Sequence, residues 1–229
     1  MFHQWFWYRV GDAGPERTID TLTHLESTPL DLNGDGLNEF LRTRYASPGL
    51  FTIQVNYLLN GASAGSNRSN LAEAIQIQNN SNLPLPLHFF QYADFDLNDS
   101  SNDDSLVITG TPRNTAHQTD PIMLVGETVT TQPPSHFEAG DVDALVSIED
   151  RLNDALPTTL ADVSGPLFSL DAAWAFQWDL LIPPGQSHLI SKLKDIRPGP
   201  NIPEPGSLAL VLGGLATMAI ARRRWTRLG

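Results

Sequence analysis

Apolar and polar residues alternate along most of the first 197 residues, with the period of two that is typical of half-buried β-strands. The pattern is clearest over residues 50–59, where Phe51, Ile53, Val55 and Tyr57 alternate with polar side chains. The other segments that we predict to be strands are residues 1–9, 19–25, 71–78, 85–95, 105–109, 122–130, 174–182 and 188–196.

Turn-forming residues separate these segments, and one of the intervening stretches predicts a short helix. Residues 147–155 have Ser147 in the N-cap position and Asp150 in the first turn. The chain has no helical stretch long enough to connect parallel strands. We therefore predict an all-β fold, an antiparallel β-sandwich over residues 1–197.

The end of the chain has a different pattern. Residues 198–205 form a proline-rich linker, and residues 206–221 carry no charge. As a helix, this run is about 24 Å long at ~1.5 Å per residue, slightly short of the ~30 Å hydrocarbon core of a bilayer. We expect a single C-terminal transmembrane helix over residues 206–221, followed by a basic cytoplasmic tail over residues 222–229.

Three features of this end occur together: Pro203-Glu204-Pro205, the uncharged run, and the cluster Arg222, Arg223 and Arg224. Together they resemble the PEP-CTERM sorting signal of exopolysaccharide-producing Gram-negative bacteria. The resemblance implies transient insertion into the inner membrane, processing by exosortase near Pro203, and delivery to the cell envelope or the extracellular surface. The alternatives are a plain tail anchor, which does not require Pro-Glu-Pro, and a buried core helix, which usually carries polar residues on one face.

Residues 1–197 contain further sequence segments that resemble the β-rich cargo domain found beside such tails. They are FWYRVG, HFFQYADFDL, WAFQWDLLIPPGQS and LISKLKDI. Residues 1–9 lack the basic start, long apolar run and cleavage site of an export signal. We therefore expect either that the natural start lies upstream or that the chain is a fragment.

Composition narrows the range of partners. The net charge is −12, which disfavours nucleic acid because such a surface repels phosphate backbones. The absence of cysteine excludes disulfides, thiolate metal sites and a cysteine nucleophile. Only two lysines occur, Lys192 and Lys194.

Residues 31–39 form a candidate calcium loop, because oxygen-bearing side chains at alternate positions of a tight loop point toward one centre. The candidate ligands are Asp31, Asn33, Asp35 and Glu39. An EF-hand needs Glu at the twelfth position, where this chain has Arg42, so the loop resembles the shorter form found in FG-GAP and related extracellular repeats. A simple hairpin turn remains the alternative, because Asn33-Gly34 and Asp35-Gly36 are turn dipeptides.

A second acidic stretch is interpreted as a solvated loop in preference to a metal site. It contains Asp94, Asp96, Asp99, Asp103 and Asp104. Paired carboxylates also perform glycosidase chemistry, but only within a cleft and with one raised pKa. The six histidines are scattered without ligand spacing and are interpreted as structural.

These observations lead to three hypotheses. The first is a non-enzymatic exported surface or extracellular-matrix protein, and the second is an exopolysaccharide- or calcium-binding module. The third is a secreted polysaccharide hydrolase. The aromatic strand faces suit either a sandwich core or stacking on sugar rings, and we favour the core.

Overall fold

The structure of the chain is a computed structural model that describes residues 2–199. The chain divides into two units between Gly199 and Pro200, and the first unit is described below. The Pro203-Glu204-Pro205 motif, the expected membrane span and Arg222, Arg223 and Arg224 lie outside the described residues. Among the residues described, no helix combines the length and apolarity needed to cross a membrane.

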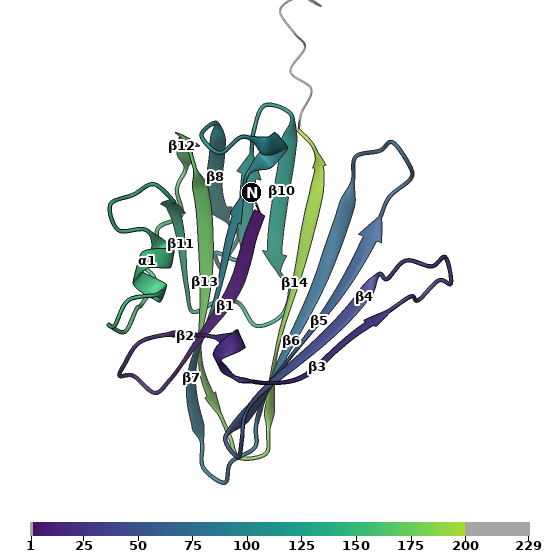
Figure 1. Cartoon of the computed structure of the whole chain (residues 1–229). Helices are drawn as coiled ribbons and strands as arrows, with labels where there is room; N and C mark the ends of the chain where they lie inside the picture. The colour runs from purple at the N-terminus through teal and green to yellow at the C-terminus, as the bar shows by residue number, and fades with distance from the viewer. Residues whose placement is uncertain (1, 200–229) are drawn as a thin grey trace, which may run out of the picture. The chain divides into compact units, whose positions relative to one another are not determined.

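The first sheet has five antiparallel strands in the order β11-β13-β7-β1-β2. Their bounds are β11 His136–Asp141, β13 Ala172–Ile182, β7 Leu85–Phe95, β1 Phe2–Val10 and β2 Arg17–Thr18. β7 pairs with β1 on one side and with β13 on the other, so segments far apart in the sequence form its centre (Figure 1).

The second sheet has nine antiparallel strands in the order β12-β8-β9-β10-β14-β6-β5-β4-β3. Their bounds are β12 Leu167–Leu170, β8 Asp104–Thr109, β9 Thr115–Thr119, β10 Met123–Val129, β14 Ser187–Pro198, β6 Ser69–Asn79, β5 Phe51–Gly61, β4 Phe40–Ser47 and β3 Thr23–Leu30. The predicted β-sandwich is confirmed.

The core lies between the two sheets and is built by the alternation seen in the sequence. Phe51, Ile53 and Val55 of β5 are fully buried on the inner face of the nine-stranded sheet. From the facing sheet, Trp174 and Trp178 of β13 enter the same core. The aromatic strand faces are therefore core, as favoured from the sequence.

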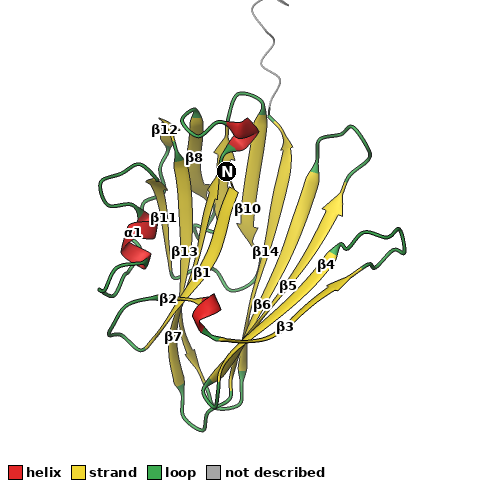
Figure 2. Ribbon diagram, viewed as in Figure 1, coloured by secondary structure: helices red, strands yellow, loops and turns green. Residues whose placement is uncertain are grey.

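The outer face of the five-stranded sheet carries a smaller core under helix α1, Ile148–Leu152 (Figure 2). Trp7 is buried there, on the opposite face of β1 from Phe6, and its indole N–H donates to Asn153 at 3.0 Å. Ser147 caps α1 in a capping box with Asp150, which confirms the predicted helix start.

The structure corrects part of the strand prediction. Residues 19–21 form the 3-10 helix η1, Ile19–Thr21, rather than the start of a strand, and β3 begins at Thr23. The strands that were not predicted are β2, β4, β9, β11 and β12. In β9 the reason is clear, because Gln118 fills a buried position where the pattern requires an apolar residue.

Candidate functional site

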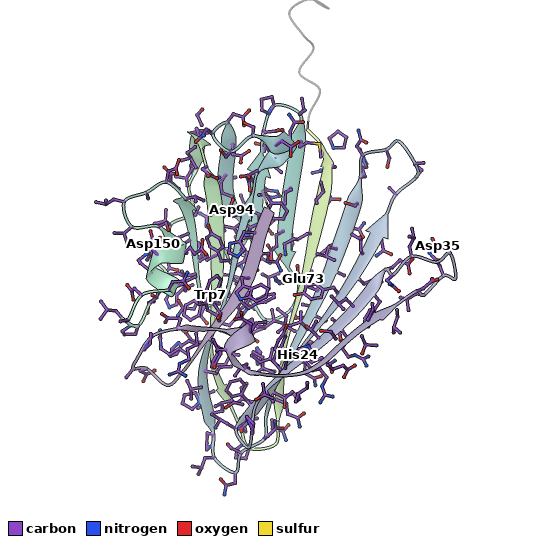
Figure 3. All side chains as sticks on the ribbon, viewed as in Figure 1. Trp7, His24, Asp35, Glu73, Asp94 and Asp150 are labelled. Atoms are coloured by element: carbon purple, nitrogen blue, oxygen red, sulfur yellow. The ribbon has the colours of Figure 1, made fainter. Side chains whose placement is uncertain are left out.

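The predicted calcium loop connects β3 to β4 at the tip of a hairpin, where Leu30 pairs with Phe40 (Figure 3). Carboxylate oxygens of Asp31, Asp35 and Glu39 lie within 4.8 Å of one another. The loop is thus a hairpin connection, and it also brings the four predicted ligands together, since the side chain of Asn33 contacts Asp35 and Glu39.

Backbone N–H groups hold the carboxylate of Asp31 in place. Its Oδ1 accepts from the N–H of Gly34 at 2.6 Å, and its Oδ2 accepts from the N–H of Gly36 at 2.8 Å. These hydrogen bonds lower the pKa of Asp31, and the bond from Gly36 has the largest effect. Both glycines have positive φ, +82° and +90°, a conformation that other residues rarely adopt.

The side chain of Asn33 lies between the other two carboxylates. Its Nδ2 donates to Asp35 at 3.2 Å and to Glu39 at 3.0 Å. This amide N–H₂ group stands in for the positive charge that a cation would supply between two carboxylates. Turning the amide would present Oδ1 instead, and an all-oxygen set with carboxylates suits calcium.

The second acidic stretch is divided by the fold. Asp94 and Asp96 are joined by Asp171, which precedes β13, and carboxylate oxygens of the three lie within 4.8 Å of one another. Asp171 is far away in the sequence and reaches Asp94 because β13 pairs with β7. Asp104 is buried elsewhere, where it accepts a hydrogen bond from Gln118.

Burial and the neighbouring carboxylate of Asp171 raise the pKa of Asp94 to about 7. Oδ1 of Asp94 and Oδ1 of Asp171 are both buried without a hydrogen-bond partner. The hydroxyl of Tyr92 is also buried without a hydrogen-bond partner. Its pKa is raised, mainly by burial and to a smaller extent by the charge of Asp94. Burial thus raises the pKa of both Asp94 and Asp171, the two carboxylates that face each other here.

A third group of charged side chains lies in the core and was not predicted. We call it the interior Lys–Glu cluster; its members are Glu73, Glu127, Lys192 and Lys194. Lys192 Nζ lies 2.7 Å from Glu73 and 3.1 Å from Glu127, and Lys194 Nζ lies 2.5 Å from Glu73 and 3.4 Å from Glu127. All four side chains are at most 2% exposed, and Figure 3 shows Glu73 inside the sandwich.

Strand register creates this cluster. Glu73 of β6 is paired with Lys192 of β14, and Glu127 of β10 is paired with Lys194 of β14. The facing sheet completes the hydrogen bonding, because Gln4 Nε2, Gln91 Nε2 and the indole N–H of Trp174 donate to the two glutamates. Two positive and two negative charges cancel within the cluster.

The pKa values of the two lysines in the cluster are shifted in opposite directions. Burial would raise the pKa of Glu73, but both lysine charges oppose this and lower it to about 2. Burial lowers the pKa of Lys192. At Lys194 burial is outweighed by the charges of Glu127 and Glu73, so its pKa is raised.

The sequence contained a signal for this cluster. Lys192 and Lys194 are in phase with the buried Ile190, and Glu73 is in phase with the buried Ile75. Charged residues at the apolar positions of a period-two pattern indicate buried charges, which must be paired.

The outer face of the nine-stranded sheet carries a hollow of about 430 Å³. Ala72 and Ala74 of β6 are small residues between larger neighbours: Leu58 is paired with Ala72 on one side, and Leu193 on the other. Other residues that line the hollow include Phe40, Asn56, Thr130 and Ser191. The hollow therefore combines an apolar wall with amide and hydroxyl groups.

No protein-family model matches the sequence, and no curated protein matches it either. Among solved structures, a bacterial glucoamylase complexed with acarbose is similar over 93% of this chain, with a TM-score of 0.53 and 8% identity. A polysaccharide lyase is similar over 86% of this chain, with a TM-score of 0.44 and 14% identity. The chain corresponds to 28% and 26% of those proteins. The glucoamylase match bears on the fold alone, and the lyase match is too weak to support an argument.

Proposed function

We propose that this chain is a non-enzymatic protein of the cell surface or extracellular matrix, exported and then sorted through its PEP-CTERM-like tail. The observation that supports a non-catalytic body is its filled interior. Aromatic side chains occupy the space between the sheets, and the buried lysines and glutamates pair with one another.

The tail supports the sorting step by its sequence. Pro203-Glu204-Pro205 precedes an uncharged run and a terminal arginine cluster, and the last strand of the sandwich ends before this motif, at Pro198. The proposed partners are exosortase, the inner membrane during transit, and exopolysaccharide at the surface.

Expression of the full chain behind a foreign export signal, in bacteria with and without exosortase, tests this proposal. We expect a processed form at the surface only when exosortase is present. Glu204→Ala should leave the chain unprocessed, whereas Pro200→Ala, in the same linker, should be processed normally. Identical processing without exosortase would contradict the proposal.

Calcium binding by the loop over residues 31–39 is a second candidate function, favoured by the convergence of three carboxylates within 4.8 Å. Titration of the full chain with calcium chloride tests it, since Asp31→Asn and Glu39→Gln should each weaken binding. Equal heats of calcium binding in the titrations of the wild type and both variants would contradict binding at this loop.

Exopolysaccharide binding is the other part of this alternative, and the hollow over Ala72 and Ala74 is the surface that favours it. The glucoamylase with a comparable fold is described as complexed with acarbose, but the similarity concerns the fold. If the hollow binds sugar, Ala74→Arg should abolish retention of the full chain on immobilised exopolysaccharide. Unchanged retention would contradict a role for the hollow.

Hydrolysis is the least supported hypothesis. Asp94 has the raised pKa of a general acid, about 7. However, its oxygens lie within 4.8 Å of those of Asp96 and Asp171, closer than the ~5–9.5 Å between the two carboxyl groups of glycosidases. This spacing is that of groups around one cation.

A further inference from the structure

A primary amine and a primary amide touch at the centre of the sandwich. Lys192 Nζ, on β14 of the nine-stranded sheet, donates to Gln91 Oε1, on β7 of the facing sheet, at 2.8 Å. Both residues are at most 2% exposed. The contact therefore joins the two sheets across the core, away from solvent.

One carboxylate contacts both nitrogens of this pair. Glu127 Oε1 lies 3.1 Å from Lys192 Nζ, and Glu127 Oε2 accepts from Gln91 Nε2 at 3.0 Å. The indole N–H of Trp174 donates to the same Oε2 at 3.1 Å and fixes its direction. A carboxylate in this position can take a proton from the amine and stabilise the departing amide nitrogen.

Burial makes the neutral, nucleophilic form of this amine easier to reach than it is in water. Burial lowers the pKa of Lys192 against the opposing charges of Glu127 and Glu73. Lys194 has a raised pKa and stays positively charged against Glu73. The cluster can thus lose one ammonium without leaving Glu73 unpaired.

We propose that Lys192 and Gln91 form an intramolecular isopeptide bond that links the two sheets, with Glu127 as the proton-transferring group. The bond is a modification of the protein by itself, and it requires no oxidant or cofactor.

Formation of this amide bond releases one molecule of ammonia. Lys192 gives one ammonium proton to Glu127, and the amine then moves from the carbonyl oxygen of Gln91 to its carbon and attacks. The new C–N bond forms while the carbonyl electron pair moves onto Oε1. The carbonyl then re-forms, the C–Nε2 bond breaks, and Nε2 leaves as neutral ammonia with one of the former amine protons. Glu127 keeps its proton, so Glu73 and Lys194 remain as the one charged pair.

Mass spectrometry of the purified full chain tests the proposal. The denatured protein should be lighter than its sequence mass by one ammonia molecule, and digestion should yield a branched peptide that joins β7 to β14. The branched peptide is the deciding signal, because the Asn33-Gly34 dipeptide can also lose ammonia by cyclising. A folded wild type that yields only linear peptides would overturn the proposal.

Two variants test the roles of the neighbours. Glu127→Gln should slow bond formation by about 100-fold or more, the scale of a lost proton-transfer group. Asp195→Asn is the matched control, since it makes the same acid-to-amide change on β14 at an exposed position outside the cluster, and it should retain the branched peptide. Tryptophan fluorescence and circular dichroism select the variants that fold. A branched peptide formed at the wild-type rate in folded Glu127→Gln would overturn the role of Glu127.

Discussion

The interior Lys–Glu cluster and the loop over residues 31–39 both gather carboxylates, but they balance the charge in different ways. In the cluster, each glutamate has two lysine nitrogens within 3.4 Å. In the loop, backbone N–H groups and one amide face the carboxylates, and water reaches them.

The difference follows from the environment of each group. Inside the sandwich an unpaired charge has a large desolvation penalty, so the cluster must be neutral within itself. At the tip of the hairpin the high dielectric constant of water weakens repulsion, so three acidic side chains can stay close together without a counter-charge. The carboxylates of the loop are therefore partly or fully exposed to water, whereas each glutamate of the cluster is paired with the two lysines.

Removing one lysine from the cluster should have the largest effect. Lys194→Met leaves a buried glutamate charge without its partner, and we expect a loss of about 3–5 kcal/mol in the free energy of unfolding. Urea denaturation measures it. Adding Glu73→Leu should restore much of the loss, since the second change removes the unpaired charge. A loss well below 1 kcal/mol for the single variant would contradict the tight pairing described for the interior.

Calcium should stabilise the protein through the loop. With free calcium at about 100 times Kd, we expect a rise of about 5–10 °C in Tm, because only the folded loop gathers the ligands. Differential scanning calorimetry with and without a chelator measures the shift. Asp31→Asn should remove it, and Asp99→Asn, outside both acidic groups, should not. The same shift in Asp31→Asn would place the calcium elsewhere.

Asp94 provides an intermediate case, acidic and partly buried without a counter-charge among the described residues. Its folded pKa of about 7 lies above its ordinary value of 3.8, so the folded state binds the proton more tightly. The contribution of Asp94 to stability should therefore be largest below about pH 4 and fall as the pH rises toward 7.

Asp94→Asn should remove this dependence and stabilise the protein at pH 8. After allowance for solvent screening, we expect about 1–2 kcal/mol. Urea denaturation at pH 5 and pH 8 measures it. An Asp94→Asn variant that is less stable than the wild type at pH 8 would show that the carboxylate is paired.

An exposed ion pair should have the smallest effect. Arg197 and Asp195 lie 3.4 Å apart, and both side chains are nearly half exposed. Asp195→Asn should change the free energy of unfolding by at most about 0.5 kcal/mol, since water screens such pairs. The same urea titration compares it directly with Lys194→Met. Equal losses for the two variants would remove the distinction between interior and surface.

Much of the sandwich could be predicted from the sequence because its strands alternate strictly. The buried face of β5, the aromatic face of β13 and the cap of α1 at Ser147 all follow from local rules. The convergence of carboxylates in the loop over residues 31–39 could also be predicted, because Asp31, Asp35 and Glu39 are close together in the sequence.

The other acidic group, the interior Lys–Glu cluster and the strand order depend on which strands become neighbours. Local sequence patterns do not contain that information. Asp171 joins Asp94 only because β13 pairs with β7. The interior Lys–Glu cluster needs β6, β10 and β14 in one register, although Lys192 and Lys194 at apolar positions were a visible sign. The strand order of the sheets likewise follows from tertiary packing.

Mass spectrometry of the protein recovered from the cell surface tests the proposed function most directly. We predict a chain whose C-terminus lies near Pro203-Glu204-Pro205 and which lacks the uncharged run over residues 206–221. Recovery of the complete chain, ending at Gly229 and found in the cytosol, would contradict export and sorting through the tail.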